Sequence, residues 1–344
     1  MLPKICLVLP YFGKLPQYWG GFIDSCADNP DIDFLIISDC ELGKLPNNVQ
    51  SKYIAWADMQ KYIQQKFKEV GINKTFINNP YKLCDYKPTY GYLFQDELRD
   101  YDFWGYIDCD LVFGNLSKFL IQIDINNFDR VHRAGHLSVF RNKTETNFLF
   151  LEKEKGIINF KDVAASTLIY QYDESAINQL FKAKKLKFFE GGFDSTFSIW
   201  DYTYRWRNAG KHNQGELFVK KKDGTTVAYT QTDSGEIVET EVNYIHYMTK
   251  KNVTIPIGQA RPFCITHNGV ISFDEKTSIA ELISKYTLCN KDQQEIFKRN
   301  EIKKFRQATY KRIINEFKYN GFYTFVELYN RFSSWLKHQR LMHT

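Results

Sequence analysis

The stretch Asp102-Phe-Trp-Gly-Tyr-Ile-Asp-Cys-Asp-Leu-Val-Phe-Gly114 decides the fold expected for this chain. Residues 103–107 form a short apolar run that predicts a buried strand, and two acids one residue apart follow it, Asp108 and Asp110. Alternate residues of a strand face the same side, so both carboxylates are expected to point to one place. Two carboxylates among apolar residues repel each other and are costly to desolvate, and a divalent cation relieves both costs. The pair therefore indicates a Mn²⁺ or Mg²⁺ site, although a plain acidic turn at a strand end gives the same short pattern.

The N-terminal segment places this strand in a sheet of parallel strands. Residues 4–9 and 34–38 are continuous apolar runs, and a helical pattern over residues 18–26 separates them. Uninterrupted apolar strands joined by a helix indicate an α/β sheet that is buried on both faces. Ligands of such sheets bind beyond the carboxyl ends of the strands. Pro10, Tyr11, Phe12, Gly13 and Asp39 follow the two runs and are expected at that edge.

The middle of the chain predicts further helices and one more core strand. Helical spacing covers residues 58–70, and Pro88 is suited to the first turn of a helix through residues 89–98, which leaves Asp85 and Lys87 in the loop before it. Residues 131–141 read as a core strand in which Gly135 lets backbone approach something closely. A helix is expected to begin at residue 147, and another covers residues 173–181 with Asp173 as its N-cap.

The pattern changes after residue 216. Alternating residues with turn signals at Asp223-Gly224 and residues 233–235 predict a β-hairpin or meander that ends in a strand leading to His246. From residue 278 onward the spacing is helical, over residues 279–286, 292–317 and 322–337. The last two segments mix Lys and Arg with aromatic residues, which fits either a solvated charged face or contact with an anionic membrane surface.

Composition is that of a globular protein that can bury a substantial core. The 344 residues are 43% hydrophobic, 25% charged and 16% aromatic, and the net charge of +6 is too modest to indicate nucleic-acid binding. The seven cysteines are scattered without a Cys-x-x-Cys pair, which indicates reduced thiols in a cytoplasmic protein. The chain shows neither a signal peptide nor an apolar run of about 20 residues, so we expect at most peripheral contact with a membrane.

Taken in order, these segments resemble the GT-A-type, metal-dependent glycosyltransferases. The resemblance is in particular to bacterial surface-polysaccharide (capsule or O-antigen) enzymes that open with "PYFGK.P" and carry "DFWG..D.D...G", here at residues 10–16 and 102–114. The resemblance covers roughly residues 4–260. It implies a Rossmann-like α/β fold, a mixed sheet flanked by helices, with a β-hairpin region. We expect a catalytic domain over 1–270, with a nucleotide-sugar half of about 1–130 and an acceptor half of 131–270, and a helical C-terminal region over 271–344.

The resemblance also implies a set of metal and donor ligands. Asp108 and Asp110 bind Mn²⁺ or Mg²⁺ on the donor diphosphate, and His246 matches a third ligand found after a late strand, although a lone His is more often structural. The set that contacts the nucleotide or sugar comprises Pro10, Tyr11, Phe12, Asp39, Asp85, Lys87, Cys109, Gly135, His136, Lys250 and Lys251. Of these, Cys109 is expected mainly to pack, and the two late lysines are alternatives for one diphosphate contact.

Three acids are the candidates for chemistry at the sugar. In related families an acid upstream of Asp-x-Asp binds donor-sugar hydroxyls, which matches Asp85, and an acid pair at a helix start matches Asp173 and Glu174. Helix capping is the competing explanation for Asp85 and Asp173. Gly191-Gly-Phe-Asp194 is a further acidic loop that could reach the acceptor, or a plain tight turn.

The leading hypothesis is therefore hexose transfer from a nucleotide diphospho-sugar, with a uridine nucleotide as the usual donor of the class. The acceptor is a growing surface polysaccharide or lipid-linked oligosaccharide. The late His favours retention of configuration, whereas an inverting enzyme needs a base such as Asp194 or Glu174. The alternatives are a glycan-binding or assembly protein with a degenerate transferase fold, a two-carboxylate hydrolase, and a sugar nucleotidyltransferase, whose glycine-rich phosphate loop this N-terminus lacks.

Overall fold

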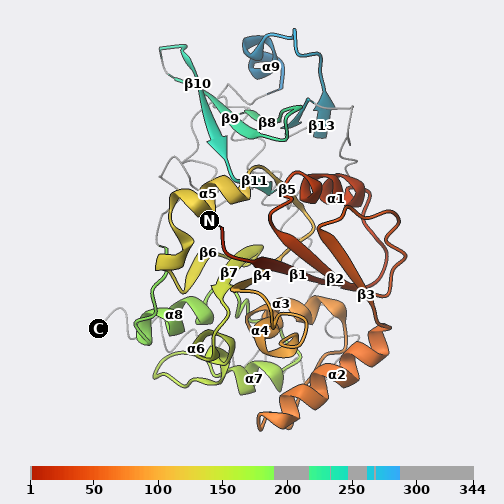
Figure 1. The fold of residues 1–344 in the computed structure, drawn as a ribbon, viewed down its shortest axis with the longest axis vertical. Helices are drawn as coiled ribbons and strands as arrows, with labels where there is room; N and C mark the ends of the chain where they lie inside the picture. The colour runs from red at the N-terminus through yellow and green to blue at the C-terminus, as the bar shows by residue number, and fades with distance from the viewer. Residues whose placement is uncertain (1, 190–216, 233, 247–261, 267–268, 287–344) are drawn as a thin grey trace.

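A mixed sheet of six strands runs through the middle of the described chain (Figure 1). The structure is a computed structural model that describes residues 2–189, 217–232, 234–246, 262–266 and 269–286. The strand order is β3-β2-β1-β4-β7-β6. The strands are β1 (Ile5–Tyr11), β2 (Asp33–Ser38), β3 (Val49–Tyr53), β4 (Phe103–Ile107), β6 (Arg130–Ala134) and β7 (Leu137–Arg141). β1, β2, β3 and β4 are parallel, whereas β7 pairs antiparallel with β4 and β6. This confirms the predicted α/β fold with a mixed sheet flanked by helices.

Helices cover both faces of this sheet (Figure 1). One face carries α1 (Trp19–Ala27) and α5 (Leu116–Gln122). The other carries α2 (Trp56–Glu69), α3 (Leu83–Tyr86), α4 (Tyr90–Leu93), α6 (Thr144–Asn147), α7 (Phe160–Ala164) and α8 (Ala176–Ala183). Alternate residues of β1 enter two different clusters of buried side chains, Leu7 and Leu9 on one face and Cys6 and Val8 on the other. Burial on both faces is the reason for the uninterrupted apolar run in the sequence.

The longer helices that flank the sheet bury one side against it. In α1 the buried positions include Trp19, Phe22, Ile23 and Cys26, which share one face at the spacing of a helix. Short 3₁₀ segments complete the helical layers: η1 (Pro80–Lys82), η2 (Lys87–Thr89), η3 (Ile125–Asn127) and η4 (Leu149–Leu151).

A second sheet of five strands lies beside α1 and α5 (Figure 1). It consists, in spatial order, of β10 (Ile237–Val242), β9 (Thr226–Gln231), β8 (Leu217–Lys220), β12 (Phe263–Thr266) and β13 (Gly269–Ser272). Phe218 of β8 packs into the main core, whereas its neighbours Leu217 and Val219 pack with Leu282 of α9 (Ile279–Tyr286). This sheet is thus sandwiched between the main core and α9. The predicted hairpins at residues 223–224 and 233–235 are confirmed by the antiparallel pairs β8–β9 and β9–β10.

Two short strands, β5 (Leu111–Phe113) and β11 (Tyr244–His246), pair with each other between the main sheet and the second sheet. β5 leaves the main sheet after β4 and pairs antiparallel with β11. Asn29, between α1 and β2, donates to the carbonyl of Gly114 at 2.9 Å and thereby fastens the end of β5 to the main body.

Several sequence predictions need correction in detail. The strand expected over residues 131–141 is two antiparallel strands with an irregular register, and the edge strand β3 was not predicted. In place of a helix over 89–98, residues 80–93 form four consecutive short helical segments, so Asp85 lies in α3 and not in a loop. The helix expected from residue 147 is replaced by α6 and η4. The helix expected from Asp173 begins at Ala176 after Ser175, so Asp173 is not its N-cap.

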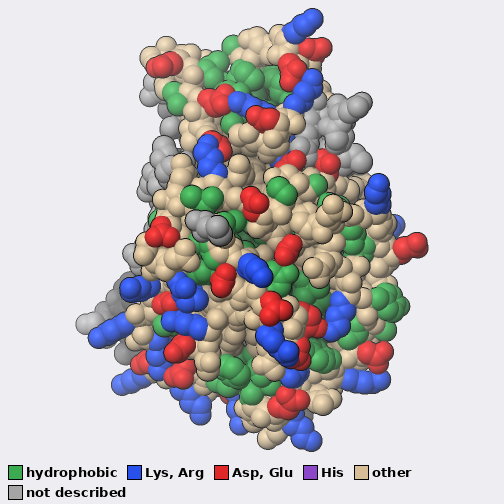
Figure 2. Space-filling model, in the orientation of Figure 1, with side chains coloured by type: hydrophobic (Ala, Val, Ile, Leu, Met, Phe, Trp, Pro, Cys, Tyr) green, Lys and Arg blue, Asp and Glu red, His purple; other side chains and the backbone are tan. Residues whose placement is uncertain are grey.

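Some expectations concern residues that the structure does not describe. These are the acidic loop Gly191–Asp194, Lys250, Lys251 and the helices expected beyond residue 286. Across the described ranges, no helix combines the length and the apolar character needed to cross a membrane. On the face shown in Figure 2, basic and acidic side chains are interspersed.

Candidate active site

The two acids of the Asp-x-Asp motif lie where the chain changes sheets. Asp108 follows β4 in the main sheet, and Asp110 precedes β5, which pairs with β11. Because His246 of β11 lies opposite Leu111, its ring comes next to Asp110, and His246 Nε2 is 3.4 Å from Asp110 Oδ1. The structure therefore brings together two predicted metal ligands that are 136 residues apart, the difference between 246 and 110.

The chemistry and spacing of these groups suit a hard divalent cation. Two atoms that bind one Mg²⁺ or Mn²⁺ at about 2.1 Å and at right angles lie about 3 Å apart, close to the Asp110–His246 separation. The side chains of Asp110 and His246 are almost buried, at 9% and 3% exposed, whereas Asp108 is 36% exposed. Within the described residues, no three His, Cys, Asp or Glu side chains already form a complete metal cluster. Asp110 and His246 thus fit such an ion as they stand, whereas Asp108, paired with Lys87, would have to turn to join them.

Lys87 forms an ion pair with Asp108 in this structure. Its ammonium group lies 2.6 Å from Asp108 Oδ1, 2.7 Å from the carbonyl oxygen of Gly135 and 3.6 Å from Asp173 Oδ2. Burial alone lowers the pKa of a lysine, but Asp108 and Asp173 outweigh burial and raise the pKa of Lys87 well above its usual value. Lys87 is therefore a fixed positive charge between the Asp-x-Asp turn and the second pair of acids.

That second pair, Asp173 and Glu174, reaches the site because Gly135 has no side chain. A Cβ atom on Gly135 would lie 2.5 Å from Glu174 Cγ and 2.9 Å from Asp173 Oδ2, closer than real Cβ contacts. The predicted close approach at this glycine is therefore to the acid pair. Burial, with a further contribution from Glu174, raises the pKa of Asp173 to about 8, although Lys87 opposes the shift.

Asp85 lies beneath these acids and is fully buried. Its two carboxylate oxygens accept hydrogen bonds from the backbone amides of Tyr170 and Tyr172, at 3.0 and 3.1 Å, and from Lys82 Nζ at 2.9 Å. Asp85 thus fastens the segment that leads directly to Asp173.

Two residues that sequence reasoning missed support the acid pair from behind. Tyr106 donates to the Asp173 carbonyl at 3.2 Å, and the fully buried Arg130 donates to the Tyr106 hydroxyl at 3.4 Å and to Asn178 at 2.6 Å. Asn178 in turn donates to the Glu174 carbonyl at 2.6 Å. The alternation of β4 offered a signal for Tyr106, which shares a strand face with Asp108. No comparable signal in the sequence pointed to Arg130, which directly follows Asp129 in a polar stretch.

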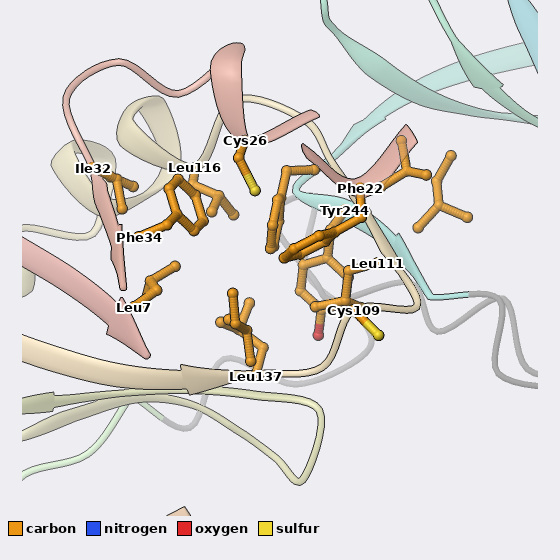
Figure 3. Packing of buried hydrophobic residues seen from close by; sticks show 14 of the residues in the cluster. Leu7, Phe22, Cys26, Ile32, Phe34, Cys109, Leu111, Leu116, Leu137 and Tyr244 are labelled. Carbon is orange, nitrogen blue, oxygen red and sulfur yellow. The ribbon is translucent and has the colours of Figure 1, made fainter. Parts of the chain in front are cut away.

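Four of the predicted donor-binding residues lie at the carboxyl ends of β1 and β2, namely Pro10, Tyr11, Phe12 and Asp39. The amide of Gly13 donates to Asp39 Oδ1 at 3.0 Å, which fixes the loop after Pro10 and Tyr11. Phe12 packs against Trp56, with ring centroids 4.9 Å apart. Cys109 is buried in the main core, which agrees with its expected packing role (Figure 3).

A cavity opens beside these residues. It has a volume of about 280 Å³ and is lined by Ser38, Cys40, Glu41, Leu42, Gly43, Leu45, Ser51, Lys52 and Tyr53. It lies at the ends of β2 and β3, next to Asp39, so the predicted base-binding edge of the sheet is hollowed.

The chain matches a known protein family. Residues 7–274 match the model described as "Family of unknown function (DUF6625)". The chain belongs to this family. The match covers both sheets and all the described site residues from β1 to His246 of this DUF6625 member. No curated protein sequence matches the chain.

Three solved structures show partial similarity to this DUF6625 member. The glycosyltransferase GlyE of Streptococcus pneumoniae TIGR4 has 12% identity and a TM-score of 0.31, over 56% of this chain and 47% of GlyE. Mouse xyloside xylosyltransferase 1 has 9% identity and a TM-score of 0.36, over 60% of this chain and 90% of the mouse protein. The galactosyltransferase LgtC, solved with donor and acceptor sugar analogs, has 10% identity and a TM-score of 0.33, over 84% of this chain and 99% of LgtC. The chain thus spans about half of GlyE.

Proposed function

We propose that this protein transfers a hexose from a nucleotide diphospho-sugar, with a uridine nucleotide as the expected donor, and that it needs Mn²⁺ or Mg²⁺. The observation that carries the proposal is the meeting of the Asp108–Asp110 turn, His246, Lys87 and the Asp173–Glu174 pair, which come from separate parts of the chain. The cavity at the ends of β2 and β3, next to Asp39, provides room for the nucleotide.

Asp108, Asp110 and His246 would hold the metal. When bound, the cation neutralises the donor diphosphate and stabilises the departing nucleoside diphosphate. Lys87 balances the charge of the acids and keeps Asp108 close to the metal position until a ligand arrives. The loop after β1, with Pro10, Tyr11 and Phe12, and Asp39 after β2 position the nucleotide. Lys250 or Lys251 contacts the diphosphate in this proposal.

Asp173 and Glu174 are the groups assigned to the sugar. Both lie beside Gly135, and Asp173 lies 3.6 Å from Lys87, which also contacts Asp108. In our proposal they orient the donor hexose and stabilise the positive charge that develops at its anomeric carbon, with retention of configuration. Asp85, which resemblance linked to the donor sugar, takes a positioning role because its oxygens hold the Tyr170 and Tyr172 amides.

The proposed acceptor is a growing bacterial surface polysaccharide, such as a capsule or O-antigen chain, or a lipid-linked oligosaccharide. The proposed place of action is the cytoplasm, with the basic and aromatic C-terminal segments in contact with the inner face of the membrane. Nucleic acid is not a proposed partner.

The test is release of nucleotide from a panel of uridine diphospho-hexoses, with Mn²⁺ or with a chelator, in the presence of glycan acceptors. We expect turnover only with the metal, and a loss of at least about 100-fold in Asp110→Asn, because the metal contributes several kcal/mol to the reaction. Asp96→Asn, which changes an exposed ion pair with Arg99, is the matched control and should keep full activity. Glycan binding without turnover of any donor would instead favour the glycan-binding alternative.

A further inference from the structure

We propose that Tyr244 and His136 form a pair that positions His246 for the divalent cation. This inference rests on the proposed metal site and adds two residues to it that act through His246 and not on the substrate. It gives His136 a positioning role in place of donor binding, and it gives a role to Tyr244, which the sequence patterns did not single out.

The ring of His246 is held from one side by the ring of His136. The two ring centroids are 3.9 Å apart with the planes tilted by 32°, so the faces are in contact. An imidazole turns freely about its side-chain bonds unless its faces are packed, and a metal ligand must be held near its working orientation. The His136 ring, in contact with that of His246, fixes the orientation of His246 while Nε2 of His246 faces Asp110.

His136 is itself held at both ends. Its ring nitrogen Nε2 lies 2.8 Å from the Tyr244 hydroxyl, and its backbone carbonyl accepts a hydrogen bond from the amide of Asp108 at 2.9 Å. The same residue therefore contacts both arms of the proposed site, the Asp-x-Asp turn through its backbone and His246 through its ring. At 4% exposed, it is buried beneath the site.

Tyr244 anchors this arrangement in the core. It is fully buried in the cluster that includes Leu111 and Leu137 (Figure 3). Tyr244 and His246 are alternate residues of β11 and lie on the same side of the strand. A phenylalanine would fill an apolar position equally well, whereas a buried hydroxyl is costly unless it has a partner. The hydroxyl on this side chain is explained by its contact with His136.

Replacing a group that orients a metal ligand usually lowers metal affinity by about 10–100-fold. We therefore expect Tyr244→Phe, which removes one oxygen atom, to weaken the binding of Mn²⁺ alone by about 10-fold. The measurement is electron paramagnetic resonance of the full-length protein titrated with Mn²⁺, which reports free and bound metal. Pulsed spectra of the bound ion should show the nitrogen coupling of His246 in the wild type and a weakened coupling in the variant.

The matched control is Tyr92→Phe. Tyr92 is a buried tyrosine of α4 whose hydroxyl donates to the Lys66 carbonyl at 2.6 Å, away from the site. The Tyr92→Phe variant should bind Mn²⁺ with the affinity of the wild type. A second variant, His136→Phe, keeps a ring against His246 but removes the partner of Tyr244, and it should lose the same affinity. Because the two residues act as one unit, the double variant should be no weaker than either single variant.

The outcomes separate this inference from the proposed function. If the wild type fails to bind Mn²⁺, or binds it equally well with Asp110→Asn, the metal site and this inference both fall. If the wild type binds Mn²⁺ with nitrogen coupling and Asp110→Asn loses it, but Tyr244→Phe matches the wild type, the metal site stands and the positioning role is overturned. Additive losses in the double variant would also contradict a pair that acts together.

Discussion

Asp173 has an unusual ionisation for a carboxyl group. Its carboxyl group is buried beside Glu174, and burial raises its pKa to about 8 from an ordinary value of 3.8. Lys87 lies 3.6 Å away and only partly offsets this, because it is shared with Asp108. Without metal or donor, Asp173 therefore carries a proton at neutral pH.

This ionisation predicts a pH dependence of stability. Between pH 3.8 and about 8 the folded protein holds a proton on Asp173 that the unfolded chain releases, so this residue lowers the free energy of unfolding as pH rises. The slope for one proton is at most about 1.4 kcal/mol per pH unit. Asp173→Asn mimics the protonated form and should remove this contribution.

Urea unfolding of the metal-free protein from pH 5 to 8.5 measures the effect. The stability of Asp173→Asn relative to wild type should increase with pH across this range. A constant difference between the two proteins would show that Asp173 is already ionised in the fold.

At the scale of elements, the site depends on a close approach between the β6–β7 turn and the segment before α8. Gly135 in the turn leaves no room for a side chain, since a Cβ there would lie 2.5 Å from Glu174 Cγ. We expect Gly135→Ala to push Glu174 and Asp173 away from Lys87 and to lower both stability, by about 1–3 kcal/mol, and donor turnover.

A double variant identifies the cause. Glu174→Ala removes the atoms that meet the new Cβ most closely, so stability lost in Gly135→Ala should return in part in Gly135→Ala/Glu174→Ala. If the two stability losses simply add, the clash with Glu174 is not what makes glycine necessary at residue 135.

The elements also show what a sequence can predict. Continuous apolar runs identified β1, β2 and β4, because strands buried on both faces carry that pattern, and alternation identified the hairpins of the second sheet. The pairing of β11 with β5 was beyond sequence reasoning, because it joins residues more than 120 positions apart through backbone hydrogen bonds. That pairing is what brings His246 to Asp110, which the resemblance implied and spacing alone did not.

The local surroundings of two predicted site acids differ from the sequence expectation. Asp85 was expected at the mouth of the sheet, but the short helical segments after Asn79 bury it beneath the site. Asp173 was expected to cap a helix that begins three residues later, at Ala176. In both cases the local pattern singled out an acid, while tertiary contacts decided what that acid touches.

At the scale of the whole molecule, the second sheet stabilises the site through a buried lysine. Lys220 of β8 is fully buried, donates to the Phe113 carbonyl of β5 at 2.6 Å, and lies 2.6 Å from Asp28 Oδ2 after α1. One ammonium group thus joins the second sheet to β5 and to the helical layer. The strand that carries Asp110 toward His246 is held from outside the main sheet.

Replacing this lysine should therefore affect the whole molecule. Lys220→Met removes the buried ammonium group that contacts Asp28 and the Phe113 carbonyl, and we expect a loss of about 3 kcal/mol in the free energy of unfolding. The neighbouring Lys221, which is one-third exposed and pairs with Glu239, provides the matched control, and Lys221→Met should change stability by less than about 1 kcal/mol. Equal effects of the two substitutions in urea unfolding would mean that Lys220 does not join the two parts.

The central claim is that a divalent metal held by Asp108, Asp110 and His246 binds the diphosphate of a nucleotide-sugar donor. The most direct measurement is calorimetric titration of the protein with uridine diphosphate, in Mn²⁺ and in a chelator, for wild type and Asp110→Asn. The account predicts binding by the wild type in Mn²⁺, and a large loss of affinity both in the chelator and in the variant. Binding that is equally tight with and without the metal, or unchanged in Asp110→Asn, would contradict it.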